Sequence, residues 1–167
     1  TALPVYGGAS FCSIFATMYT HKKSLGQHFL KDEAVIQNII TVLKKEKFNK
    51  LLEVGPGAGA LTRYLMELPG VDFKAVELDE EKVVYLLKKY PALQNKVIHQ
   101  SFLDMNKPFD SPFVVIGNFP YNISTQILFK LLEWKEDVPC IIGMFQKEVA
   151  ERAASKEGSK VYGVLSV

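Results

Sequence analysis

The chain has 167 residues, of which 48% are hydrophobic and 23% charged, and its formal net charge is +2. This composition suits one globular domain and excludes a largely disordered chain. The nearly balanced charge means that any nucleic-acid surface must be local. No apolar stretch is long enough for a membrane-spanning helix, so we expect a cytoplasmic protein without membrane contact. The two cysteines, Cys12 and Cys140, fit no metal or redox spacing.

Residues 1–21 are apolar but irregular, and they contain Pro4, Gly7 and Gly8. They have neither the basic leading segment nor the long apolar block of a signal peptide. We expect them to form an N-terminal extension, partly disordered, ahead of a catalytic domain at residues 22–167.

Strand and helix patterns alternate along the rest of the chain. Short apolar strands are predicted at 51–54, 73–78, 97–100, 113–116 and 140–145. Helices are predicted after a cap at Asp32, between the glycines near 59 and Pro69, from 79 to 90, and from Ser124 or Thr125. Repeated units of this kind predict an α/β fold, a mostly parallel sheet with helices on both faces. Such sheets bind ligands at the carboxyl ends of their strands.

A glycine-rich turn follows the first of these strands, with glycines at Gly55, Gly57 and Gly59. Glycines here permit a tight turn and close approach of a ligand to the backbone. Glu77 ends the next strand about 20 residues later, where a carboxylate can accept from ribose hydroxyls. The order predicts a nucleotide site, although a plain turn followed by a solvated acid has the same sequence.

The identity of the nucleotide stays open at this point. The turn from Gly55 to Ala60 also fits the dinucleotide pattern, which predicts an NAD-dependent enzyme with a pyrophosphate at the helix N-terminus. The alternative is S-adenosylmethionine, whose amino acid end needs a different cradle. Glu53 before the glycines and Asn118 on the fourth strand favour the second interpretation, and nothing in the chain looks like a hydride-transfer site.

The tetrapeptide Asn118-Phe119-Pro120-Tyr121 directly follows an apolar run and Gly117. The Asn side chain and a nearby main-chain carbonyl can both accept from an exocyclic amino group, and an aromatic ring beside them can stack on the base. At the end of a strand, this is equipment for methylating adenine on N6. A strand followed by a proline turn, with Tyr121 as a core aromatic, explains the same residues.

With these motifs assembled, the chain resembles the ribosomal RNA adenine dimethyltransferase family, whose bacterial members modify the small-subunit RNA. The similarity covers roughly residues 22–167. Its segments are Lys23–Leu30, Leu52–Gly57, Val76–Asp79, Gly117–Ser124, Gln146–Arg152 and Tyr162–Val167.

The resemblance implies a Rossmann-like domain that uses S-adenosylmethionine to dimethylate adenosines near the 3' end of 16S rRNA. It implies the small ribosomal subunit as partner, a monomer and no metal. The implied catalytic residues are Asn118, Phe119, Pro120 and Tyr121. The implied cofactor contacts are Gln27, His28, Leu30, Gly55, Gly57, Glu77, Leu78, Ser101, Phe102 and Asn118.

Three departures from the family pattern matter. His28 stands where the family usually has Asn, and Ser101 stands where an Asp usually holds the adenine amino group of the cofactor. Ser101 accepts without charge, so we expect weaker cofactor binding; Asp104 is an outside candidate for that role. Family members also continue beyond the position of Val167 with further strands and a small helical domain, so we expect a C-terminally truncated domain with weak or no turnover alone.

Contact with RNA is expected from two basic groups near the two ends of the domain. They are Lys22, Lys23 and Lys31, and Lys147, Arg152, Lys156 and Lys160. A solvated helix face explains each group equally well. Two functional alternatives remain: a large-subunit rRNA adenine methylase conferring macrolide resistance, and a non-catalytic RNA-binding relative.

Overall fold

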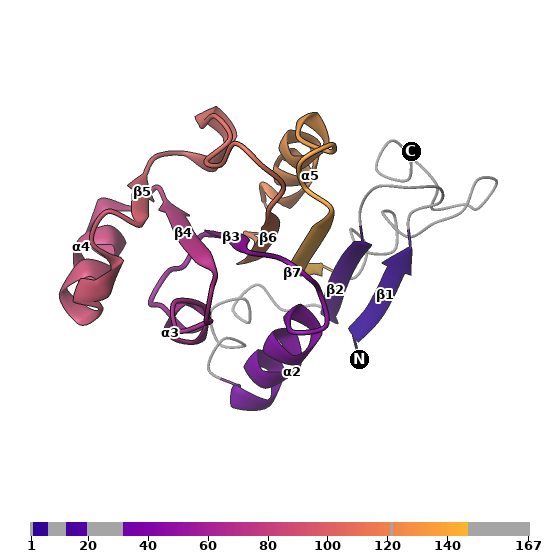
Figure 1. The fold of residues 1–167 in the computed structure, drawn as a ribbon, viewed down its shortest axis with the longest axis horizontal. Coiled ribbons are helices and arrows are strands. Elements are labelled where there is room, and N and C mark those ends of the chain that lie inside the picture. The colour runs from indigo at the N-terminus through magenta and orange to yellow at the C-terminus, as the bar shows by residue number, and fades with distance from the viewer. Residues whose placement is uncertain (1, 7–12, 20–31, 121, 147–167) are drawn as a thin grey trace.

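The computed structural model describes residues 2–6, 13–19, 32–120 and 122–146. Within them lies a seven-stranded sheet in the order β1-β2-β7-β6-β3-β4-β5 (Figure 1). The strands are β1 Ala2–Tyr6, β2 Ser13–Tyr19, β3 Lys50–Val54, β4 Asp72–Glu77, β5 Val97–His99, β6 Val114–Asn118 and β7 Cys140–Gln146. All neighbouring strands pair in parallel except β1 and β2. The predicted α/β fold with a mostly parallel sheet is confirmed.

The α-helices of the described residues are α2 Glu33–Leu43, α3 Thr62–Leu65, α4 Glu80–Lys89 and α5 Ser124–Glu133. As predicted, Asp32 caps α2, because its carboxylate accepts from the Ala34 N–H at 2.9 Å. Among these helices, α3 is shorter than its apolar pattern predicts. The reason is local: the backbone around it makes turn-type bonds, such as Tyr64 N–H to Leu61 O, and Pro69 follows soon after.

Two apolar cores lie on opposite faces of the sheet, because successive strand residues point to opposite sides. One core joins Leu51 and its counterparts on neighbouring strands to α2, α3 and α4. The other joins Leu52 and its counterparts to α5. Figure 1 shows α5 on one side of the sheet and α2 and α3 on the other. The predicted helices on both faces are therefore present.

The sheet begins inside residues 1–21, where the sequence predicts no strand. Here β2 runs parallel to β7, with Ser13 opposite Cys140 and Tyr19 opposite Gln146. Without β2, one side of β7 would present unpaired N–H and C=O groups, and such an edge readily takes another strand. The expectation of an irregular extension therefore does not describe residues 2–6 and 13–19.

Across the part of the chain that the structure describes, no helix is long and apolar enough to cross a membrane.

We expect Phe73→Ala to lower the free energy of unfolding by about 3–5 kcal/mol, because the ring is 1% exposed and its loss leaves a cavity. The matched control is Phe129→Ala, since that ring on α5 is 40% exposed. The control should change stability by no more than about 0.5 kcal/mol. Urea unfolding of the two variants and the parent chain measures both values, and equal losses would contradict the assignment of the core.

Candidate functional site

Three parallel strands bring the predicted site residues to one edge of the sheet. Val54 lies opposite Val76 on β4 and opposite Gly117 on β6, so all three strands end at nearly the same level. The residues that follow or end them are therefore neighbours. A Cβ placed on Gly55 would lie 4.0 Å from the carbonyl oxygen of Asn118.

The glycine turn after β3 needs glycine for two different reasons. Gly55 and Gly57 have φ of +68° and +55°, a left-handed conformation that other residues rarely adopt. A Cβ on Gly59 would come within 2.8 Å of the Tyr90 ring, so glycine there permits close packing. A Cβ on Gly57 would meet no atom within 4 Å. The backbone at Gly57 therefore faces space that a ligand can enter.

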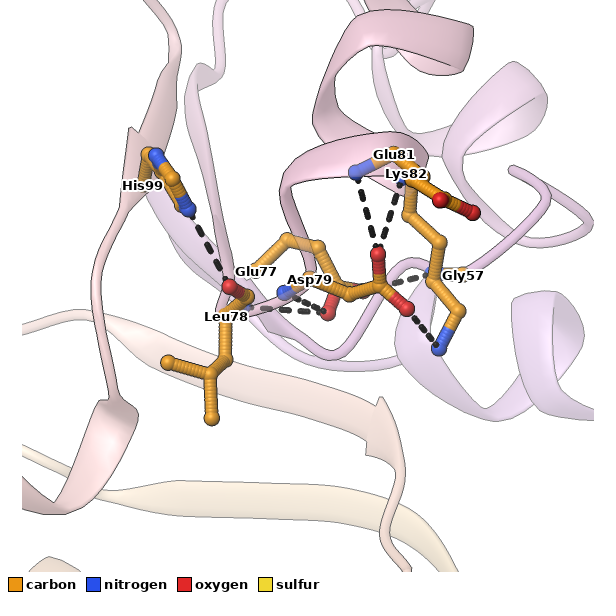
Figure 2. Close-up of polar contacts among 7 residues, drawn as sticks. All are labelled: Gly57, Glu77, Leu78, Asp79, Glu81, Lys82 and His99. Carbon is orange, nitrogen blue, oxygen red and sulfur yellow. Dashed lines mark hydrogen bonds and ion pairs between the residues drawn. The ribbon is translucent and has the colours of Figure 1, made fainter.

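The carboxylate of Glu77 ties this turn to the end of β4 (Figure 2). Its Oε2 accepts from the Gly57 N–H at 3.2 Å. Its Oε1 accepts from the N–H groups of Leu78 and Asp79, each at 3.0 Å. A carboxylate offers about four acceptor positions, so three backbone donors leave one for a ribose hydroxyl. A second hydroxyl would have to replace the longer bond from Gly57.

A second carboxyl group, that of Glu53, lies deeper on the same edge. Its side chain is 2% exposed and its Oε2 has no hydrogen-bond partner. Burial raises the pKa of this carboxyl to about 8, although Thr62 counteracts the rise, and the nearby charge of Glu77 adds to it. The Thr62 hydroxyl itself makes no well-formed hydrogen bond. Glu53 precedes the glycine turn in the sequence, but no sequence pattern predicts its burial. That burial depends on the packing of α3.

The raised pKa of Glu53 makes the stability of the fold depend on pH. The unfolded chain releases the Glu53 proton near the ordinary value of 4.5, whereas the folded protein keeps it until about pH 8. Folding therefore binds a proton between these values, and its contribution to stability falls as the pH rises through that window. Such a loss of stability is typical of an ionisable group at a functional site.

Asn118 is the last residue of β6, at the predicted strand end, and its side chain is half-buried. The Phe119 ring turns into the core: it is 5% exposed and packs on Phe145 with 4.8 Å between ring centroids. A Cβ on Gly143 would lie only 2.2 Å from this ring. Pro120 is exposed. The packing of Phe119 therefore holds the backbone that follows Asn118.

The remaining described candidates flank the acidic end of β4. Leu78 is 66% exposed, and its carbonyl contacts His99 Nε2 at 3.1 Å. Ser101 is half-buried and precedes a short 3-10 helix, Phe102–Asp104. The Phe102 ring is 7% exposed and packs edge-on against Trp134, with 5.6 Å between centroids.

Several predicted residues lie outside the described ranges. They are Gln27, His28, Leu30 and Tyr121, and the basic residues Lys22, Lys23, Lys31, Lys147, Arg152, Lys156 and Lys160. Their roles stay predictions. Among the described residues, no cluster of three His, Cys, Asp or Glu side chains is suited to hold a metal ion.

The parallel sheet, the glycine turn and the acid that ends β4 define a Rossmann-like domain of the kind found in methyltransferases. The model of one family, ribosomal RNA adenine dimethylase, matches residues 18–167. The chain belongs to this family. The resemblance inferred from the motifs is thereby confirmed.

Known relatives agree with this assignment. Ribosomal RNA small subunit methyltransferase A of Flavobacterium johnsoniae is 50% identical over 149 residues, which are 87% of this chain and 57% of that protein. Its counterpart in Parabacteroides distasonis is 53% identical over 148 residues, covering 87% of this chain and 55% of that protein. The chain thus spans a little over half the length of the curated relatives it matches.

Two solved structures share the fold. A dimethyladenosine transferase from Plasmodium falciparum has a TM-score of 0.67 and 27% identity, covering 81% of this chain and 49% of that one. The 23S rRNA methyltransferase ErmE has a TM-score of 0.55 and 27% identity, covering 72% of this chain and 49% of that one.

We expect Gly143→Ala to destabilise the chain by about 1–3 kcal/mol, because its new methyl group would overlap the Phe119 ring. Phe119→Leu in the same chain makes room and should recover part of that loss. A cycle of the two single variants and the double variant, measured by urea unfolding, gives the coupling energy. Strictly additive effects would show that the ring does not fill this space.

Proposed function

We propose that residues 22–167 are the catalytic domain of an enzyme that dimethylates N6 of adenosines near the 3' end of small-subunit 16S rRNA. One observation carries the proposal: Asn118 ends β6 directly beside the Gly55 turn. An acceptor for the target amine thus adjoins the cofactor pocket. Membership of the family and about 50% identity to proteins named for the small subunit support this substrate.

The residues on the β3 and β4 side fit S-adenosylmethionine, which supplies the methyl group when bound. Gly57 faces open space, Glu77 is a buried carboxylate with an acceptor position left, and Glu53 has an unpaired oxygen. A nucleoside with a cationic amino acid end matches these groups. By the resemblance, Leu78, Ser101 and Phe102 would border the adenine and ribose. In the same way, Gln27, His28 and Leu30 would close over the amino acid end.

On the β6 side, Asn118 Oδ1 and the Phe119 carbonyl would accept the two N6 hydrogens of the target base. The N6 lone pair is delocalised into the ring, so these acceptors favour the pyramidal, nucleophilic nitrogen and stabilise its developing charge. Since Phe119 is fixed against Phe145, its carbonyl is positioned before the base arrives. No strong general base is needed, because the product cation is acidic and loses its proton late.

The target adenine must leave its stack before it reaches Asn118. Unstacking costs a few kcal/mol and is easiest in a loop or single strand. Tyr121 would repay part of this by stacking, a contact of about 1–3 kcal/mol per base. The basic groups of the sequence would bind the phosphates, which makes binding weaken steeply with salt.

The alternatives have less support. The large-subunit methylase interpretation has a structural neighbour in ErmE, but at 27% identity against about 50% for the small-subunit proteins. A non-catalytic RNA-binding relative would not need the acceptor at Asn118 beside the glycine turn. An NAD-dependent enzyme is suggested by the glycine turn alone. A cytoplasmic monomer that acts on the assembling small subunit fits the proposal.

In the full-length protein, we expect Asn118→Ala to reduce methyl transfer from labelled cofactor to small-subunit rRNA by at least about a hundredfold, since it removes an acceptor used in the transition state. The control is Asn49→Ala, because Asn49 is exposed and immediately precedes β3, at the opposite end of that strand. It should transfer two methyl groups per target adenosine at the parental rate. Undiminished transfer by Asn118→Ala would rule out the mechanism.

Calorimetry of the chain with S-adenosylmethionine and, separately, with NAD tests the cofactor. We expect saturable heat with the first ligand only, because the acidic pocket suits a cationic amino acid end and repels a pyrophosphate. Tight binding of NAD alone would overturn the assignment of the site.

A further inference from the structure

Glu53 lies on the face of the sheet that carries α2, α3 and α4. Leu51 belongs to the core on that face, and residues two apart on a strand share a face. The side chain is 2% exposed, and its Oε2 has no hydrogen-bond partner. A carboxylate that is buried without a partner is strongly disfavoured in its charged form. Without a cation beside it, this group is therefore a neutral acid.

A second acid stands beside it on the same face. Glu53 lies opposite Ala75 in the β3–β4 register, and Glu77 follows Ala75 by two residues. Glu77 accepts from three backbone N–H groups. On β6, the residue opposite Glu53 is the uncharged Ile116, and the neighbour on the α3 side is Thr62.

The acidic pair lacks a cation among the described residues. Their ion pairs involve Glu33, Asp79, Asp137 and Glu133, and none reaches Glu53 or Glu77. Burial raises the pKa of Glu53 to about 8, an effect that Thr62 partly offsets and the charge of Glu77 reinforces. A cation placed beside the pair would reverse this balance. S-Adenosylmethionine, the cofactor of the proposed function, carries two cationic groups, a sulfonium and an α-ammonium group.

On the basis of the proposed function, we propose that Glu53 is protonated in the empty site and releases its proton when S-adenosylmethionine binds, becoming the counter-ion of a cationic group of the cofactor. The proton passes to solvent, and no other bond is made or broken. Glu53 is thereby a positioning residue that couples cofactor affinity to pH.

The direction of this coupling follows from linkage. Binding selects the ionised carboxylate, and below pH 8 each unit of pH lowers the ionised fraction of the empty protein about tenfold. Affinity should therefore rise about tenfold per unit between roughly pH 6 and pH 8 and then level off. The cofactor's own α-amino group loses its proton near pH 8, so the measurements are made at and below pH 7.5.

Calorimetry of the chain at pH 7, in buffers with low and high ionisation enthalpy, counts the protons released. The parent chain should release about 0.9 proton per cofactor bound, given a carboxyl that titrates at about 8. Glu53→Gln keeps the shape but has no proton to lose, so it should release none and show no such pH trend. Glu67→Gln changes an exposed acid near α3 and should behave as the parent. S-Adenosylhomocysteine, which lacks the sulfonium charge, shows which cation is paired: release with both ligands assigns the ammonium group, and release with S-adenosylmethionine alone assigns the sulfonium group.

Saturable binding without proton release by the parent chain, or equal release by Glu53→Gln, would overturn the proposal. Failure of the proposed function looks different, because no binding heat would then appear in any buffer. A second measurement needs no variant. In protein labelled with ¹³C at glutamate carboxyls, one carboxyl should titrate near pH 8 without cofactor and at a clearly lower pH with cofactor bound. An unchanged titration would equally refute the proton release.

Discussion

The Phe119 ring occupies a space that exists only because two neighbouring strands carry no side chain beneath it. A Cβ at Gly143 would lie 2.2 Å from the ring, and one at Gly117 would lie 3.1 Å from it. The packed ring fixes the course of the backbone after β6. Asn118 is thereby held beside the glycine turn. The proposed pocket for the target base therefore depends on packing inside the sheet more than on contacts at its surface.

In the proposed cofactor pocket, two neighbouring carboxyl groups differ in their hydrogen bonding. Glu77 receives three backbone donors, whereas Glu53 receives none at its Oε2. Two like charges side by side are unfavourable, and burial raises the pKa of the Glu53 carboxyl. Glu53 is thus a buried acid without a partner at its Oε2, at the place where the proposed cofactor would bring positive charge. Because the Glu53 carboxylate is unfavourable without a cation, a cationic group of the proposed cofactor would stabilise it.

Much of this arrangement follows from local sequence signals. Asp32 as a helix cap, the glycine turn and Glu77 at the end of a strand each depend on residues close by in the chain, and the structure has them as predicted. What the sequence does not reveal depends on distant partners. The burial of Phe119 requires Gly143 on another strand, and that of Glu53 requires packing of α3. The strands within residues 2–19 require the edge of β7, which no local pattern announces.

Trp134 gives the domain an intrinsic optical probe. It is the single tryptophan of the chain, it is 8% exposed, and its ring meets Phe102 edge-on. Phe113 lies 6.1 Å away and the Lys130 ammonium 5.2 Å away, measured to ring centroids. Fluorescence of the unmodified chain therefore comes from tryptophan at one location, where the segment after β5 rests on α5. A ligand that displaced Phe102 would alter the surroundings of that indole directly, so its binding would be visible without attaching a dye.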